Sequence, residues 1–439
     1  MNKSMLIKNG RIIDPSQGLD MTGDLLVSGG KIKSVAEIIK EIPADCSILD
    51  ARHMVVCPGF IDFHCHLRQP GFEEKETIAT GSRAAAAGGF TTICCMPNTS
   101  PALDNKATID YIKAASAADA CIRVLPIGCI TRGRAGKELA DMGELAEAGV
   151  VAFSDDGSTI ADSRIMKQAL EYSLIFGLPI SDHCEDAMLS EGGQINEGII
   201  ATRLGLRGIP NAAEENIIAR NIALAKLTGA RIHICHISTH GSVELIRLAK
   251  KDGVKITAEV TPHHLTMDEE MVLGYDTNAK VNPPLRTRKD IDALIKGLKD
   301  GTIDIIATDH APHTANEKLC EFSKAPFGIS GFETAFGSLM KLVHNGDIEL
   351  NLLISKMTAA PAKIIGNRFG TLGTLKVEAP ADITVFNPDE EWTVDTDKFY
   401  SKGKNTPLNG VELKGKILAT IYNGKAVYKD NSLKPGDKA

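Results

Sequence analysis

The 439-residue sequence lacks the features that mark membrane proteins and binders of nucleic acid. It has no apolar run near the ~20 residues that span a bilayer. The segment Met1–Lys8 is too short in its apolar part to be a signal peptide. The formal net charge is -7, and charges of both signs are interspersed, which argues against nucleic acid or an anionic membrane as a partner. We therefore expect a cytoplasmic protein.

The sequence also lacks a phosphate-binding loop and clustered cysteines. No glycine-rich phosphate-binding loop occurs where an expected strand meets an expected helix, as it ordinarily would in a doubly wound nucleotide-binding sheet. The ten cysteines are spread thinly, and several lie inside apolar runs, which indicates buried thiols in a reducing compartment. Cys65, Cys184 and Cys235 each adjoin a histidine in an expected strand, so their side chains point to the opposite face. We do not expect them to bind metal.

The two ends of the chain share a pattern of short apolar runs separated by turns. The turns are expected at Asn9-Gly10, Gly29-Gly30 and Asn423-Gly424. No helix of any length fits the first 55 residues. Because neither end is long enough to make a stable sheet by itself, we predict that residues 1–57 and 367–439 combine into one small β domain.

The central part, residues 58–366, alternates eight strand-like runs with helical segments. The apolar runs are 60–66, 91–98, 122–130, 150–156, 179–185, 231–238, 255–264 and 303–310. Helical composition is found, for instance, in 78–87, 109–118, 165–176, 212–228, 242–250 and 291–299. Eight such units predict an α/β fold, a (β/α)8 barrel of the TIM type, with a doubly wound open sheet as the alternative.

The first strand-like run ends in two histidines. Side chains alternate along a strand, so His64 and His66 point to the same face, as two ligands of one metal ion would. Other runs also end in polar residues, at the strand ends where barrels of this kind have their active sites. These residues are Asn98, Asp155, Asp156, His183, His236, His263, His264, Asp309 and His310.

Four histidines and two carboxylates that converge in this way predict a divalent metal site, most simply zinc. We expect His64, His66 and Asp309 to hold one ion, and His183 and His236 a second. Two close cations need a shared anion between them. An aspartate at the end of the fourth strand could supply it, and spacing alone leaves both Asp155 and Asp156 as candidates.

Such a site would lower the pKa of bound water towards ~7 and polarise a carbonyl, which is the chemistry of amide hydrolysis. Asp309 would accept the proton of the nucleophile and pass it to the leaving nitrogen. Arg68 follows His66 by two residues. It is therefore close enough to bind a substrate carboxylate through two parallel hydrogen bonds.

Four motifs resemble those of the dihydroorotases in the amidohydrolase superfamily, specifically the longer bacterial class, type I. They are GFIDFHCHLRQPG (59–71), MPNT (96–99), NPPLR (282–286) and ATDHAPH (307–313). The resemblance covers essentially the whole chain. It implies reversible cyclisation of N-carbamoyl-L-aspartate to (S)-dihydroorotate in pyrimidine (UMP) biosynthesis. It also implies zinc as the cofactor, with one or two ions per chain and two as our expectation.

The resemblance also implies roles for individual residues. The metal ligands would be His64, His66, Asp156, His183, His236 and Asp309, and Asp309 would also be the catalytic residue. The substrate would contact His66, Arg68, Asn98, Asn282, His313 and the backbone of Phe327 and Gly328. The resemblance selects Asp156 rather than Asp155 as the bridge. Many superfamily members use a carboxylated lysine there, and no lysine ends the fourth strand of this chain.

The segment 314–329 follows the last strand, is polar and lacks clear periodicity. We predict that it is a mobile loop that closes over the substrate.

Two other functions compete. Another cyclic amide hydrolase, acting on hydantoins, dihydropyrimidines or allantoin, would use the same metals, but Arg68 and Asn98 favour an acidic substrate. A non-catalytic partner of aspartate transcarbamoylase would be expected to lack metal ligands, and this chain keeps all of them. The sequence leaves open whether the chain forms a homodimer or associates with that enzyme.

Overall fold

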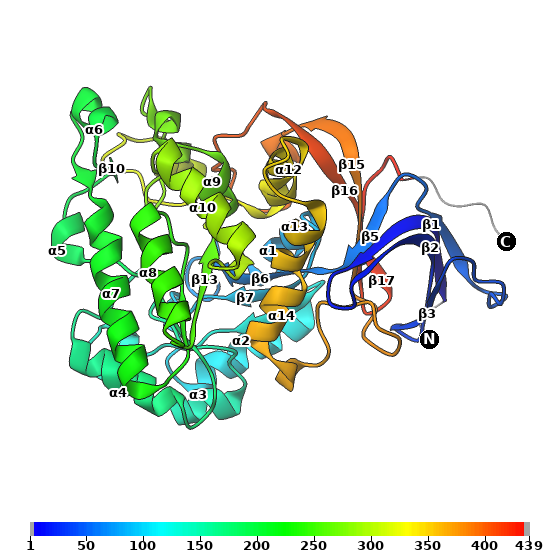
Figure 1. The fold of residues 1–439 in the computed structure, drawn as a ribbon, viewed down its shortest axis with the longest axis horizontal. Coiled ribbons are helices and arrows are strands. Elements are labelled where there is room, and N and C mark those ends of the chain that lie inside the picture. The colour runs from blue at the N-terminus through cyan, green and yellow to red at the C-terminus, as the bar shows by residue number, and fades with distance from the viewer. Residues whose placement is uncertain (1–3, 434–439) are drawn as a thin grey trace.

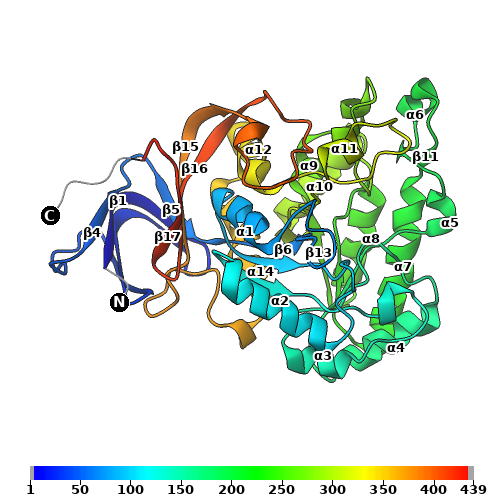
Figure 2. The ribbon, with the colours of Figure 1, turned by 180° about the vertical axis from the view of Figure 1, so that it is seen from behind.

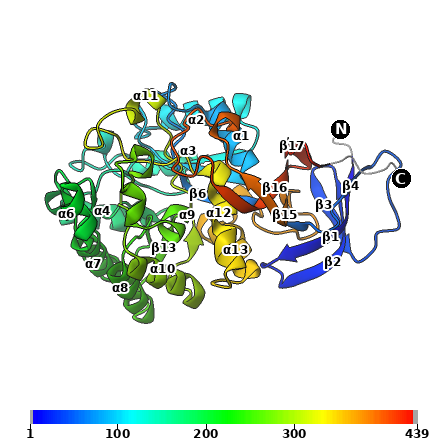
Figure 3. The same cartoon turned by 90° about the horizontal axis from the view of Figure 1, so that it is seen from above.

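The computed structural model describes residues 4–433 and has an α/β fold with two distinct parts (Figure 1). Short parallel strands surrounded by helices form one side of the molecule, and a large, mostly antiparallel sheet forms the other. The same division is seen from behind and from above (Figures 2 and 3). Within residues 4–433 we find no helix with the length and apolar character that crossing a bilayer requires.

The large sheet contains eight strands drawn from both ends of the chain. They are β1 (Met5–Asp14), β2 (Leu19–Ser28), β3 (Lys31–Ala36), β4 (Ser47–Asp50), β5 (Val55–Pro58), β15 (Ile383–Thr393), β16 (Glu412–Tyr422) and β17 (Lys425–Lys429). Their order is β17-β16-β15-β5-β1-β2-β3, and β4 pairs with β1. In Figure 1, β5 lies between the late strand β15 and the early strand β1. The two ends of the chain therefore share one set of backbone hydrogen bonds.

The predicted turn at Asn9-Gly10 is wrong, because β1 continues through these residues. Its pairing with β2 shifts register between Ile7 and Gly10, so Asn9-Gly10 forms a bulge rather than a hairpin turn. A Cβ at Gly10 would lie 2.7 Å from Val56 Cγ2, which explains the glycine. The turns at Gly29-Gly30 and Asn423-Gly424 are confirmed, since they join β2 to β3 and β16 to β17.

The parallel strands form two sheets. One contains β6 (Phe60–Cys65), β7 (Phe90–Cys95) and β8 (Arg123–Pro126). The other has the order β14-β13-β12-β9 and contains β9 (Ile180–Asp182), β12 (Ile232–Ile234), β13 (Ile256–Val260) and β14 (Ile305–Ile306). Isolated parallel bridges join Gly128 to Phe153, Phe153 to Ile180, and Cys65 to His310. The predicted fourth strand, 150–156, is not a regular strand. Only Phe153 in this range forms β-bridges, one to Gly128 and one to Ile180.

Helices follow most of these strands. The longer ones are α1 (Ile78–Ala87), α2 (Lys106–Asp119), α3 (Met142–Ala148), α4 (Ser163–Ser173), α7 (Asn211–Thr228), α8 (His240–Lys251), α10 (Arg288–Asp300), α12 (Phe332–His344), α13 (Leu350–Met357) and α14 (Ala359–Ile365). Short elements are α5 (Ala187–Ser190), α6 (Ile199–Leu204), α9 (Pro262–Thr266), α11 (Ala315–Lys318), β10 (Ile195–Asn196) and β11 (Gly208–Ile209). The 3-10 helices are η1 (Arg132–Arg134), η2 (Glu269–Val272), η3 (Thr277–Ala279), η4 (Asn367–Phe369) and η5 (Thr396–Lys398).

Hydrophobic spacing explains why the predicted helices form. In α10, Ile291, Leu294, Ile295 and Leu298 are buried, and their spacing of three and four residues places them on one face. The six predicted helical segments all correspond to helices, and α1 matches its predicted range. The helical composition of these segments therefore located the elements.

The predicted seventh strand, 255–264, is too long. Strand β13 ends at Val260, and Thr261 caps helix α9 by accepting a hydrogen bond from the backbone N–H of His264. Pro262 occupies the first turn of α9, where its missing N–H costs nothing. His263 and His264 therefore lie on a helix and not at a strand end.

Asp14 links the two ends of the chain. Its buried carboxylate accepts hydrogen bonds from the Thr374 hydroxyl at 2.9 Å and the Leu375 N–H at 2.7 Å. It also accepts bonds from Ser16 N–H and the Gln17 amide. These bonds connect the end of β1 to the segment that leads into β15.

Replacing Asp14 with Ala should lower the free energy of unfolding, because the buried Leu375 N–H and Thr374 hydroxyl lose their acceptor. We expect a loss of about 1–3 kcal/mol, measured as a lower melting temperature in a thermal scan. Asp45→Ala, at an exposed aspartate, is the control and should melt as the parent does. A melting temperature for Asp14→Ala equal to that of the control would contradict this account of the junction.

Candidate active site

The predicted site residues converge on a single cavity of about 340 Å³. Its lining includes His66, Arg68, Asn98, Asp156, His183, His236, Asn282, Asp309, His313, Phe327 and Gly328. His64 does not reach the cavity surface, since its side chain is fully buried against the others. The structure thus brings together residues that are up to 264 positions apart in the sequence, from His64 to Gly328.

The parallel strands bring these side chains together. His64 lies in β6, His183 follows β9, His236 follows β12 and Asp309 follows β14. The carboxyl ends of parallel strands meet at one edge, so the residues there become neighbours. Arg68, His236 and Asp309 also have positive φ angles of 61°, 31° and 46°. Non-glycine residues seldom adopt this backbone conformation, and when they do it is often at functional sites.

The carboxylates and imidazoles make close contacts. Asp156 Oδ1 lies 3.3 Å from His64 Nε2 and 3.7 Å from His236 Nε2, and its Oδ2 lies 3.5 Å from His66 Nε2. Asp309 Oδ1 lies 3.0 Å from His66 Nε2 and 3.5 Å from His64 Nε2. Two groups of histidines and aspartates therefore surround His64: one with Asp156 and His236, and one with His66 and Asp309. A third group that could hold a metal ion joins His64 to Cys235 and Glu259.

These donors fit a divalent metal ion. His64 Nε2, Asp156 Oδ1 and His236 Nδ1 are buried and have no hydrogen-bond partner among residues 4–433. Buried polar atoms are rarely left in this state, because their desolvation is not compensated. The ligand atoms of each group lie within 4.8 Å of one another. Nitrogen and carboxylate oxygen at this spacing suit zinc.

The electrostatics keep the carboxylates in the form that binds metal. Burial opposes ionisation of Asp156, but the neighbouring His64 and His236 outweigh it and hold its pKa well below the usual value. The pKa of Asp309 is likewise lowered, against its burial, by His64 and His66. Metal ligation requires deprotonated carboxylates, so both aspartates are ready for this role.

Asp155 and Asp156 have different surroundings. Asp155 Oδ1 accepts hydrogen bonds from the N–H groups of Ile130 at 2.9 Å and Thr131 at 3.0 Å, and its Oδ2 accepts the Thr131 hydroxyl. Asp155 is thus engaged with the neighbouring loop, whereas Asp156 lines the cavity beside the histidines. This arrangement favours Asp156 as the bridging ligand.

His183 lies beside the cluster rather than within either group of three. Its Nδ1 is 2.9 Å from His236 Nε2, and its Nε2 is 3.0 Å from Glu185 Oε2. Burial opposes protonation, but Glu185 outweighs it and raises the pKa of His183 to about 8. Asn282 donates a hydrogen bond to the same Glu185 oxygen at 3.0 Å. Glu185 was not predicted from the sequence, where it is an ordinary carboxylate after β9.

Arg68 brings a positive charge to the cavity. Its Nε donates to the Pro312 carbonyl at 3.2 Å, and it forms no ion pair within the described part of the chain. Asn98 Oδ1 accepts the Nδ1–H of His66 at 2.9 Å, and His313 Nε2–H donates to the Phe327 carbonyl at 2.9 Å. A guanidinium without a carboxylate partner can bind an acidic ligand.

Glu259 is a further residue that the sequence analysis missed. It is fully buried in β13, with Oε1 2.5 Å from His64 Nδ1 and Oε2 3.0 Å from His233 Nε2. Carboxylates in this position orient metal-binding histidines and increase their basicity. The signal in the sequence was a single acid inside the apolar run 256–260.

The segment 314–329 lies over the cavity, with Pro326, Phe327 and Gly328 in its wall. It begins with helix α11 and buries Lys318, Phe322 and Ala325. Its movement over a substrate stays a prediction.

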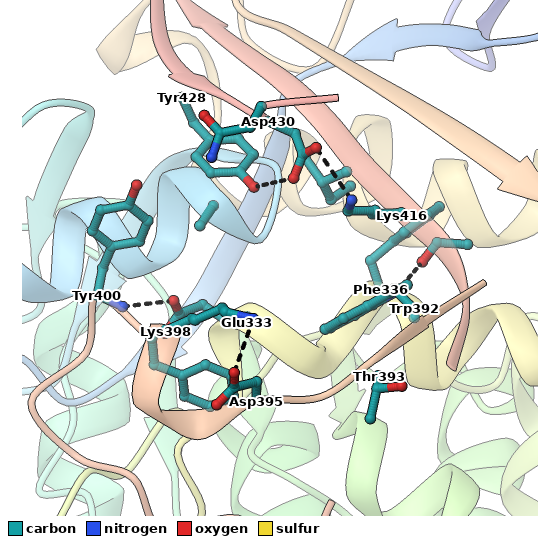
Figure 4. Close-up of a pocket in the computed structure, with 16 residues that line it drawn as sticks. Glu333, Phe336, Trp392, Thr393, Asp395, Lys398, Tyr400, Lys416, Tyr428 and Asp430 are labelled. Carbon is teal, nitrogen blue, oxygen red and sulfur yellow. Dashed lines mark hydrogen bonds and ion pairs between the residues drawn. The ribbon is translucent and has the colours of Figure 1, made fainter. Parts of the chain in front are cut away.

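A second cavity, of about 440 Å³, lies between α12 and the strands β15, β16 and β17 (Figure 4). Its two lysines are paired with carboxylates: Lys398 with Asp395 at 2.9 Å, and Lys416 with Asp430 at 3.1 Å. No histidine or cysteine is among the residues that line it. We therefore assign the chemistry to the smaller cavity, which contains the cluster of histidines and aspartates.

Solved structures with the same fold include two hydantoinases. One is an L-hydantoinase (dihydropyrimidinase) from Arthrobacter aurescens, with a TM-score of 0.87 and 24% sequence identity; the match covers 98% of this chain and 97% of that one. The other is a D-hydantoinase (dihydropyrimidinase) from a Thermus species, with a TM-score of 0.84 and 25% sequence identity; the match covers 98% of this chain and 97% of that one. Together with the buried histidine–aspartate cluster, this fold defines the class: an amidohydrolase-type protein with a candidate metal site.

The particular family follows from closer relatives. The model of the "Dihydro-orotase-like" family matches residues 53–242. A dihydroorotase from Caldanaerobacter subterraneus subsp. tengcongensis is 53% identical over 97% of this chain and 98% of its own length. One from Citrifermentans bemidjiense is 50% identical over 97% and 99%. This chain belongs to the dihydroorotase family.

Replacing Glu259 with Gln keeps the side-chain volume but removes the negative charge beside His64. We expect zinc affinity to fall by about 10- to 100-fold, measured by competition with a chromophoric chelator. Glu244→Gln, whose parent side chain is 62% exposed on α8, is the control and should bind zinc as the parent does. Unchanged zinc affinity in Glu259→Gln would show that the carboxylate does not support the metal site.

Proposed function

We propose that this protein is a zinc-dependent dihydroorotase, which interconverts (S)-dihydroorotate and N-carbamoyl-L-aspartate in pyrimidine (UMP) biosynthesis. The observation that carries the proposal is the position of Arg68, an arginine without an ion pair in the described chain, in the same cavity as the histidine–aspartate cluster. The cluster suits hydrolysis of an amide, and the guanidinium suits a substrate that carries a carboxylate. The names of the relatives agree with this combination.

The proposed cofactor is two zinc ions per chain, with Asp156 as the bridge. The ligands would be His64, His66, Asp156, His183, His236 and Asp309. Bound zinc would supply a water of lowered pKa, near ~7, and polarisation of the scissile carbonyl. The fit rests on the orphaned atoms of His64, Asp156 and His236.

The protein groups have separate tasks in this reaction. Asp309 accepts the proton of the attacking water and returns it to the leaving ring nitrogen, as a general base and then a general acid. Arg68 binds the substrate carboxylate, while Asn98, Asn282 and His313 border the same cavity and fix the orientation of the ring. Phe327 and Gly328 form the facing wall through their backbone. A Cβ on Gly328 would lie 2.7 Å from the Ala311 carbonyl oxygen, so this wall requires glycine.

Two alternatives are weaker. A hydrolase of neutral rings, such as hydantoins, dihydropyrimidines or allantoin, would leave Arg68 without a carboxylate to bind. A non-catalytic partner of aspartate transcarbamoylase would have no use for a complete set of metal ligands. Homodimerisation and association with that enzyme stay expectations from the sequence, which sedimentation of the chain alone and with aspartate transcarbamoylase would test. A cytoplasmic location is likewise an expectation from the sequence.

We also propose that residues 58–366 form one closed (β/α)8 barrel, with residues 4–57 and 367–433 as a small β domain. The rest of the predicted ranges 1–57 and 367–439 lies outside the described residues. The bridges Gly128–Phe153, Phe153–Ile180 and Cys65–His310 support closure, because each joins edges that the two parallel sheets would otherwise leave open. The shared eight-stranded sheet supports the composite domain.

Replacing Arg68 with Met should lower kcat/KM for dihydroorotate by about 30-fold or more. Leaving a carboxylate without its charged partner in such a site costs about 2–5 kcal/mol. Loss of the ring absorbance measures the rate, and zinc content should not change. Arg132→Met, whose parent side chain is 64% exposed, should be as active as the parent. If Arg68→Met kept the parental rate, the substrate assignment would be wrong.

Removing the metal should abolish hydrolysis of dihydroorotate. A chelator should strip the purified protein to less than ~10% of its activity, and added zinc should restore it, since catalysis depends on metal-activated water. Metal analysis should find zinc in the active sample. Full activity in a sample free of metal would contradict the metal-dependent mechanism, and zinc without activity would favour the non-catalytic alternative.

A further inference from the structure

Two buried lysines lie behind the wall of the active-site cavity. The exposed fractions of Lys280 and Lys318 are 2% and 5%. Neither forms an ion pair within residues 4–433. Burial lowers the pKa of Lys280 to about 8, and burial together with the charge of Lys280 lowers that of Lys318 to about 7. Burying an ammonium without a carboxylate is costly, so the hydrogen bonds that it makes must offset the cost.

Lys280 donates hydrogen bonds mainly to backbone carbonyls of one short segment. Its Nζ lies 2.7 Å from the Phe322 oxygen, 3.3 Å from the Ser323 oxygen and 2.7 Å from the Ala325 oxygen. It also donates to Gln194 Oε1 at 2.5 Å. These bonds determine the path of the chain immediately before Pro326.

Lys318 makes a second connection to the same wall. Its Nζ donates to the Pro326 carbonyl at 2.8 Å and to the Thr277 carbonyl at 2.9 Å. The Thr277 hydroxyl donates back to the Lys318 carbonyl at 2.7 Å. The backbone of Lys318 is therefore hydrogen-bonded to Thr277, and the Lys318 ammonium links Pro326 to Thr277 as well.

Lys280 also joins this segment to another part of the substrate cavity. Its carbonyl accepts the N–H of Gly328 at 2.9 Å, and its ammonium lies 4.6 Å from the centre of the Phe327 ring. Asn282, two residues further on, lines the cavity together with Phe327 and Gly328. One residue thus fixes the distance between two surfaces that the substrate would touch.

We propose that Lys280 is a positioning residue for the substrate: it holds residues 322–325 so that Phe327 and Gly328 face Asn282, and Lys318 provides the second tie at Pro326. The inference rests on the proposed function, because it assigns these ties to binding of the acidic ring. An apolar side chain could fill the same space, but it could not donate to the carbonyls.

The test uses Lys280→Met and Lys318→Met, which keep an unbranched side chain, one heavy atom shorter, and remove the donors. We expect KM for dihydroorotate to rise about 10-fold or more, with kcat changed less than about 3-fold, because substrate contacts are misplaced while Asp309 and the metal ligands stay in place. Zinc content should equal that of the parent. Lys324→Met lies in the same segment with its side chain 70% exposed, and it should leave KM unchanged.

Hydrogen–deuterium exchange gives a readout that does not depend on activity. Amides of residues 319–328 should exchange about 10-fold faster or more in both buried-lysine variants, and at the parental rate in Lys324→Met. If the parent does not hydrolyse dihydroorotate, the proposed function fails, and exchange still decides whether the lysines hold the segment.

Three results would overturn the proposal. The first is parental KM and exchange in both buried-lysine variants. The second is faster exchange with unchanged KM, which would make the ties structural only. The third is loss of zinc and kcat without a rise in KM. If Lys280→Met does not fold, Lys318→Met decides by the same criteria.

Discussion

Buried charge is the constraint on which this site depends. Asp156 is a buried carboxylate and Asp309 a largely buried one, and both are held against the imidazoles of His64 and His66. Removing such charges from water costs several kcal/mol per ion, and the cost is offset only when each has close partners. His64 and His66 supply part of this compensation, Glu259 in turn lies 2.5 Å from His64 Nδ1, and selected atoms of the cluster have no partner within the described residues. A divalent cation would complete the arrangement by contacting these atoms.

The fold places these charged side chains close together and buries the apolar surfaces around them. Each short parallel strand places one or two side chains at a common edge. The strands β6, β7 and β12 are buried along their whole length. The neighbouring helices and the sheet shared by the two chain ends cover the remaining apolar surfaces (Figures 1 and 3). The strained backbone at Arg68, His236 and Asp309 is maintained because the surrounding structure determines it.

Local rules predicted much of this from the sequence. The two-residue period of strands placed His64 and His66 together, and helical composition located α10. Features set by distant contacts were not predictable. The bulge at Asn9-Gly10 depends on Val56, and the difference between Asp155 and Asp156 depends on hydrogen bonds to another loop. Buried acids and lysines were the hardest to interpret. Glu259 interrupts an apolar strand, and the side-chain partners of Lys280 are mostly carbonyls about 40 residues away.

Anomalous diffraction at the zinc edge, from crystals grown with zinc, tests the central claim most directly, because it locates the metal without relying on turnover. We expect anomalous peaks at the cavity end of β6: one among His64, His66 and Asp309, and one beside His183 and His236, with Asp156 between them. No anomalous peak at this cluster, or zinc bound only elsewhere on the molecule, would contradict it.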